Sequence, residues 1–186
     1  MKSIRRIVTL SAVILLAQMF ATISCFGEQL SFNLEGSNIS LNVPKGWTAV
    51  EGLFGMPLMI NGPEKDNFRP TVSITPVATD VKIIEFDDPE KEEKDFREGR
   101  ISWLEEVNGK LVDWLPLTKV SLNSQVKGYE AGLRYTLAGQ KAVFSSRITY
   151  APCGGTLYLL KSLFTQHEEK AYKKTVDDIY RSISCK

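Results

Sequence analysis

The sequence predicts an α+β fold in which a largely antiparallel sheet is flanked by two main helices. Strand-like alternation of apolar and polar residues recurs along most of the chain, whereas helical periodicity occurs only in the middle and at the end. The later strands are separated by connections of hairpin length, so neighbouring strands should run antiparallel. Residues 28–186 are predicted to form one domain, because their number suits a single core.

The N-terminus has the pattern of a secretory signal. Lys2, Arg5 and Arg6 precede an apolar stretch at residues 7–21, and this order is typical of a signal peptide. The stretch is shorter than the about 20 residues that a spanning helix needs, although a retained N-terminal anchor is the alternative. We therefore assign residues 1–27 to a signal and expect the remainder to be exported.

Cys25 lies at the end of this signal, in the sequence Thr-Ile-Ser-Cys. The Ser-Cys ending is similar to a bacterial lipobox, but the usual Leu at its first position is missing. Cys25 is thus a candidate for lipidation, which would attach the protein to a membrane. Ordinary cleavage after Ser24 or Gly27 is the alternative, because both are small residues. The predicted location is periplasmic or, for a lipoprotein, membrane-anchored.

The first half of the mature chain is predicted to contain strands and one helix. Residues 29–34 and 39–43 alternate around a turn and predict a hairpin. Residues 71–77 predict a further strand, and Pro70 and Pro76 indicate that its ends, or one edge, lack ladder partners. Asp88 followed by Pro89 is a strong helix start, and Asn108 with Gly109 is a stop signal. Four apolar side chains are expected to share one face of this helix: Phe96, Trp103, Leu104 and Val107.

The second half is rich in predicted strands, at residues 117–122, 127–137, 142–150 and 156–164. A final helix should begin at Thr165, because Glu168 three residues later completes a capping box. Its apolar stripe consists of Tyr172, Val176, Ile179 and Ile183.

Cys153 and Cys185 are predicted to form a disulfide. An exported chain meets an oxidising environment, and the removal or acylation of Cys25 leaves these two cysteines as a pair. The strand at 156–164 runs about 30 Å away from Cys153, and a helix at about 166–184 returns by about 28 Å. An antiparallel packing of helix on strand would therefore bring Cys185 close to Cys153.

Composition and motifs exclude several functional classes. Removing the three cations of the signal leaves 20 basic and 22 acidic residues, so nucleic-acid binding is not expected. The single histidine, His167, stands beside two glutamates at a helix start, where the helix dipole explains the acidic residues. No Gly-x-Ser-x-Gly sequence accompanies it, so a hydrolase has little support. We expect no cofactor, no metal site and no catalytic residues.

Two pairs of adjacent carboxylates occur, and each has a structural explanation. Asp88, with Asp87 before it, is placed to cap a helix. Asp177 and Asp178 lie between the apolar positions of the last helix, so their side chains are expected to face water.

The segment at residues 52–59 is the candidate partner-binding loop. Glycines in this segment are interspersed with the apolar residues Leu53, Phe54, Met56 and Leu58. Flexible segments that contain Met suit an adaptable contact surface. The alternative is a loop that packs onto the core, since apolar loop side chains usually point inward.

Two short motifs resemble those of a known family. Residues 43–47 read Val-Pro-Lys-Gly-Trp after the first hairpin, and residues 67–74 read Asn-Phe-Arg-Pro-Thr-Val-Ser-Ile. The chain resembles the PsbP/DcrB-like group of small exported proteins, in which a Pro-x-Gly-Trp turn and a Phe-x-Pro-Asn-Val-like strand occur in this order. Thr71 departs from the pattern, because Asn is frequent there. The resemblance implies a helix-sheet-helix sandwich and a non-enzymatic accessory or binding role.

These observations together predict an exported, non-enzymatic accessory or binding protein of the cell envelope. It would act through contacts with another envelope or secreted protein. The alternatives are the binding of a small apolar ligand in a pocket between sheet and helix, and, with less support, a hydrolase.

Overall fold

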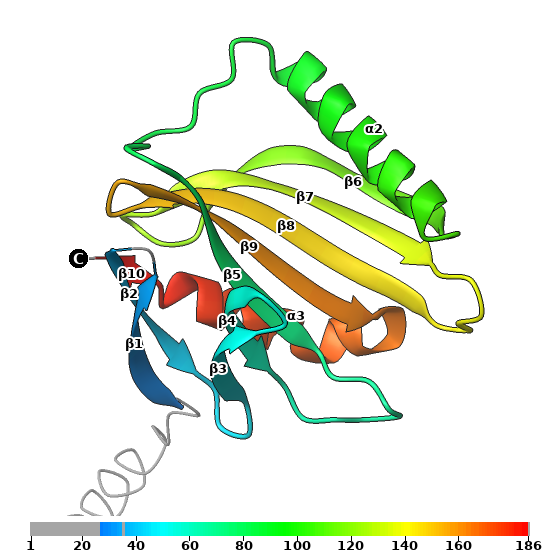
Figure 1. Cartoon of the computed structure of the whole chain (residues 1–186), viewed down its shortest axis with the longest axis horizontal. Helices are drawn as coiled ribbons and strands as arrows, with labels where there is room; N and C mark the ends of the chain where they lie inside the picture. The colour runs from blue at the N-terminus through cyan, green and yellow to red at the C-terminus, as the bar shows by residue number, and fades with distance from the viewer. Residues whose placement is uncertain (1–26, 35, 186) are drawn as a thin grey trace, which may run out of the picture.

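The structure, a computed structural model, describes residues 27–34 and 36–185. This part of the chain folds into two antiparallel sheets and two helices (Figure 1), which confirms the predicted α+β class. The larger sheet has the strand order β3 (Thr48–Leu53), β4 (Met56–Asn61), β5 (Thr71–Thr79), β9 (Thr156–Thr165), β8 (Val143–Cys153), β7 (Lys127–Thr136) and β6 (Lys110–Ser121). The predicted signal segment up to residue 26, and with it Cys25, lies outside the described residues.

The smaller sheet has three strands: β1 (Glu28–Leu34), β2 (Ser37–Val43) and β10 (Ser184–Cys185). β1 and β2 form the predicted N-terminal hairpin. β10 comes from the far end of the chain and pairs with the centre of β2, where Cys185 lies opposite Ile39. The two ends of the described part of the chain are therefore joined in one sheet.

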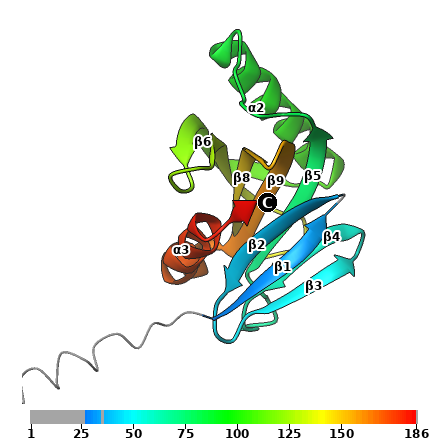
Figure 2. The same ribbon diagram turned by 90° about the vertical axis from the view of Figure 1, so that its left-hand side faces the viewer.

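The two helices lie on opposite faces of the seven-stranded sheet (Figure 2). Helix α3 (Gln166–Arg181) and the smaller sheet cover one face, over a core that includes Leu41, Ile60 and Ile179. Helix α2 (Pro89–Glu106) covers the other face above β6, β7 and β8. Leu104 is the buried residue of this helix. The sheet is thus the middle layer of a sandwich.

Local sequence signals set the helix boundaries. The Asp88 carboxylate accepts a hydrogen bond from the Lys91 N–H and caps α2, as predicted. Glu168 accepts hydrogen bonds from both the N–H and the hydroxyl of Thr165, which fixes the start of α3. Val107 does not belong to the buried face of α2 as predicted, because the helix ends at Glu106 and Val107 is already its exposed cap.

Strand β6 begins at Lys110 and not at residue 117, so the sequence-based boundary was wrong. Pro116 lies inside this strand. In the structure β6 is an edge strand, and its register against β7 shifts between Leu115 and Thr118. An edge strand tolerates proline at such a bulge, because the missing N–H has no ladder partner to lose.

The structure joins Cys153 at the end of β8 to Cys185 in β10 by a disulfide, with the two Cα atoms 5.6 Å apart. β9 leads away from Cys153, and α3 returns alongside it. The disulfide therefore holds the C-terminal strand against the turn between β8 and β9.

Candidate functional site

The tip of the β3–β4 hairpin exposes an aromatic side chain. Leu53 pairs with Met56, so Phe54 and Gly55 form a two-residue loop, and both have positive φ angles, of 52° and 74°. This is the type I′ arrangement, which favours Asn-Gly and matches the twist of the strands. Phe54 is 88% exposed and Met56 is 39% exposed. Both the positive φ angle and the exposure to water are therefore unfavourable for this bulky apolar residue.

The rest of the predicted partner-binding loop belongs to the protein interior. Leu58 is 0% exposed and packs in the core with Ile60 and Ile74, so the assignment of Leu58 to a contact surface was wrong. Leu53 is half-buried. The physical reason is the strand period of two, which turns Leu58 and Ile60 of β4 toward the core once the hairpin has formed. Of the predicted residues, Phe54 and Met56 remain as candidates.

The structure keeps the other sequence candidates apart. His167 is exposed at the start of α3, where its Nδ1 lies 3.2 Å from the hydroxyl of Thr165. Asp178 forms surface ion pairs with Lys174 and Arg181. Asp177 does not face water as predicted, because Arg147 of β8 reaches it across the sheet surface.

A polar cluster around Arg147 lies between the sheet and α3. Its guanidinium donates two hydrogen bonds to the Glu130 carboxylate, at 3.2 and 2.9 Å, and one to Asp177, at 2.6 Å. Thr149 also donates to Glu130, and the guanidinium lies 5.5 Å from the centre of the Tyr180 ring. Burial alone would lower the pKa of Arg147, but these carboxylates outweigh it and raise that pKa above its ordinary value. This cluster fastens α3 to the sheet.

Sequence reasoning missed this cluster. Glu130 and Arg147 occupy the polar positions of two alternating strands. The available signal was the opposite charge of side chains on the same face of two paired strands. The sequence did not show that α3 packs over them.

A second, unpaired cation lies beneath α2. Burial lowers the pKa of Lys161 below its ordinary value of 10.5, and the charge of Arg100 lowers it further. The ammonium group lies 5.7 Å from the centre of the Trp103 ring. Among the described residues it has no carboxylate within ion-pair distance.

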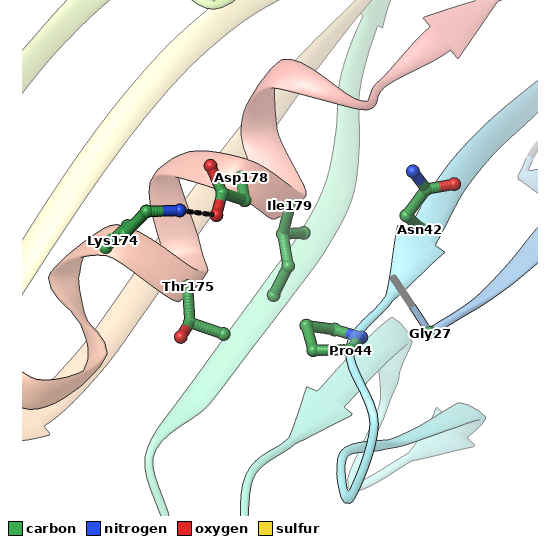
Figure 3. Close-up of a pocket in the computed structure, with 7 residues that line it drawn as sticks. All are labelled: Gly27, Asn42, Pro44, Lys174, Thr175, Asp178 and Ile179. Carbon is green, nitrogen blue, oxygen red and sulfur yellow. Dashed lines mark hydrogen bonds and ion pairs between the residues drawn. The ribbon is translucent and has the colours of Figure 1, made fainter. Parts of the chain in front are cut away.

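A small cavity of about 280 Å³ lies between α3 and the end of β2 (Figure 3). Lys174 and Asp178 on its α3 side form an ion pair, and Ile179 and Pro44 supply apolar walls. Because its two charges neutralise each other, this cavity offers little to attract a charged ligand.

The described residues contain no group of three or more His, Cys, Asp and Glu side chains that could hold a metal ion. In the same part of the chain, no helix is long and apolar enough to cross a membrane.

The architecture is that of the PsbP-like α+β proteins. The chain is similar to the solution structure of cyanobacterial PsbP (CyanoP) from Synechocystis sp. PCC 6803, with a TM-score of 0.54 and 11% identity, over 86% of this chain and 94% of that chain. It is also similar to LpqN of Mycobacterium tuberculosis, a protein involved in cell envelope biogenesis, with a TM-score of 0.51 and 16% identity, over 85% of this chain and 90% of LpqN.

A weaker similarity, with a TM-score of 0.45 and 11% identity, links it to the Ran-binding protein Mog1p of Saccharomyces cerevisiae, over 84% of this chain and 95% of that chain. No family model and no curated protein sequence matches the chain. The PsbP-like fold predicted from the short motifs is thus established by structure alone.

Proposed function

We propose that this protein is an exported, non-enzymatic accessory protein of the cell envelope that binds another protein through the tip of its β3–β4 hairpin. Phe54 is the anchor of this contact, and Met56 is its flexible neighbour. The envelope location is supported by the signal-like N-terminus and by the Cys153–Cys185 disulfide. The role of LpqN in envelope biogenesis is consistent with it.

The observation that carries this proposal is the conformation and exposure of Phe54. Its positive φ places it where Asn, Asp or Gly would be more stable, and its ring is almost wholly in water. Two unfavourable features at one position indicate a residue that serves a contact and not the fold. Aromatic side chains are also enriched among the residues that dominate binding energy at protein interfaces.

The decisive experiment is crosslinking in the intact envelope of wild-type protein and of the Phe54→Asn variant. Asparagine suits the first position of a type I′ turn, so the variant should fold at least as well as the wild type. We expect the crosslinked partner to be recovered with the wild type and lost with Phe54→Asn.

Val112→Thr is the matched control. Val112 is another exposed apolar residue, on the edge strand β6 and away from the hairpin tip. This variant should keep the crosslink. Retention of the partner by Phe54→Asn, or equal loss with Val112→Thr, would contradict a specific role for the tip.

A further inference from the structure

Helix α2 covers only part of the sheet face on which it lies. The apolar cluster beneath α2 takes residues from β6, β7, β8 and β9 and, within the described residues, none from β3, β4 or β5. The register of the strands places six side chains on the remaining part of this face, which we call the open face: Val50, Met59, Ser73, Thr75, Leu159 and Lys161.

All six side chains of the open face are half-buried, although β4, β5 and β9 bury their alternate residues completely. These alternate residues point to the opposite face, under α3 and the smaller sheet, and five of them are at most 1% exposed: Leu58, Ile60, Val72, Ile74 and Leu160. One face of these strands is therefore a core, and the other lacks a covering layer in the described part of the chain.

Lys161 is the one charged member of the open face, and a second cation, Arg100 of α2, lies near enough to lower its pKa further. Each cation is held against an aromatic ring of α2. The Lys161 ammonium lies 5.7 Å from the centre of the Trp103 ring, and the Arg100 guanidinium lies 5.0 Å from the centre of the Phe96 ring. Neither cation forms an ion pair with another described residue. Two half-buried cations are thus placed together without a counter-ion.

The carboxylates of α2 do not supply this counter-ion. All but one of them are exposed, and the exception, Glu93, accepts a hydrogen bond from the indole N–H of Trp114 on β6. Burial and a neighbouring positive charge both disfavour the ammonium form of Lys161, so this side chain destabilises the fold. Titratable groups with pKa values shifted in this way are more frequent at functional sites than elsewhere.

The open face is continuous with the hairpin tip. The Thr75 hydroxyl lies 3.9 Å from the Met56 sulfur. Met56 and Lys161 are separated by three residues along β4 and by two strand spacings across the sheet, a distance of about 14 Å. A standard protein interface buries roughly 800 Å² on each partner, which is a patch about 30 Å across. One partner can therefore cover both the tip and the open face.

We propose that the partner of the hairpin tip extends across the open face and places a carboxylate, flanked by apolar residues, between Lys161 and Arg100. The carboxylate provides the counter-ion that the fold lacks, and the flanking residues cover Val50, Met59 and Leu159. A free small anion would meet the two cations but would leave these apolar side chains in water. The inference rests on the function proposed above, because the same partner is meant.

The first test is carbodiimide treatment of the intact envelope, because this reagent joins an amine directly to a carboxylate that is in contact with it. We expect a branched peptide in which the Lys161 amine is joined to an Asp or Glu of the partner that crosslinks through the hairpin tip. Mass spectrometry of the digested product identifies both ends of the linkage. Absence of a peptide linked through Lys161 would overturn the inference, whether or not the partner crosslink forms. A linkage of Lys161 to some other protein would also contradict it.

The second test measures the yield of the partner crosslink in variants of Lys161. Lys161→Met should reduce this yield by about tenfold, because a partly desolvated charge contact is lost. The same variant is expected to fold more stably than the wild type, so unfolding does not explain the reduction. Lys161→Arg keeps the charge and should restore most of the yield. Lys45→Met is the matched control, because it removes an exposed lysine from the turn between β2 and β3 and should leave the yield unchanged.

The variants separate this inference from the function on which it rests. An unchanged yield in Lys161→Met, together with a loss in Phe54→Asn, would overturn the role of the open face and retain that of the tip. A loss in Lys161→Met with a full yield in Phe54→Asn would contradict the tip and keep the open face as the contact. Equal losses in Lys161→Met and Lys45→Met would show a general effect of net charge and would also overturn the proposal.

Discussion

Arg147 of β8 donates a hydrogen bond of 2.6 Å to Asp177 of α3, and this contact joins the helix to the sheet. Arg147 is only 15% exposed. Replacing Arg147 with Ala would leave Glu130 and Asp177 half-buried without their cation. Breaking a fully buried pair costs about 3–5 kcal/mol, so we expect a loss of about 2–3 kcal/mol here, measured by urea unfolding.

Lys174→Ala is the control for this prediction. Lys174 also pairs with an aspartate of α3, but its side chain is 83% exposed. Its removal should change the free energy of unfolding by less than about 0.5 kcal/mol, as for most surface pairs. Similar losses in both variants would show that burial does not decide the strength of the Arg147 contact.

Lys161 should titrate below 10.5, and Arg100→Gln should raise its pKa, because a neighbouring positive charge disfavours the ammonium form. NMR of the lysine side-chain carbons measures both values. An unchanged pKa in Arg100→Gln would contradict the assigned cause.

Lys161→Met should raise Tm by about 2–4 °C, which corresponds to about 1 kcal/mol in a chain of this size. Between the lowered pKa and 10.5, the unfolded state binds more protons at Lys161 than the folded state, so wild-type stability gains with rising pH in this window. The advantage of Lys161→Met should therefore shrink over the same window. A constant difference would contradict the linkage.

The Cys153–Cys185 disulfide closes a loop with a sequence separation of 32 residues. Replacing both cysteines with alanine should lower the free energy of unfolding by about 3–4 kcal/mol in the chain-entropy model. The two-residue strand β10 should also lose protection from hydrogen exchange, because its remaining tie is a short pairing with β2. Free thiols at both positions in protein isolated from the envelope would refute the disulfide.

Leu58 and Phe54 should respond oppositely to substitution, although they are four residues apart. Leu58→Ala creates a cavity in the core and should cost about 2–5 kcal/mol. Phe54→Asn should leave Tm unchanged or raise it, because Asn is favoured in this turn. Thermal unfolding measures both, and a fall of several degrees in Phe54→Asn would show that the ring supports the fold.

The lipidation of Cys25 is tested by metabolic labelling with a palmitate analogue. Acylated protein should carry the label and partition into detergent, and Cys25→Ser should lose both properties. Absence of label from the wild type would exclude the anchor and leave ordinary signal cleavage.

The class of the fold and most element positions could be predicted from the sequence. The start of α2 at Asp88, the capping box of Thr165 and Glu168, and the alternation of β7 and β8 were all readable, because caps and strand periods depend on neighbours along the chain. The start of β6 was placed too late, and the observed strand contains Pro116, which an edge strand tolerates but a central strand does not. Whether a strand lies at an edge is a property of the whole sheet.

Which side chains of these elements are available to a partner depends on how the elements pack together. Phe54 and Leu58 are both apolar residues of one segment, yet one is exposed and the other fully buried. Asp177 and Asp178 are neighbours, yet one pairs with the sheet and the other with its own helix. Burial and pairing depend on residues distant in the chain, and no local pattern contains them.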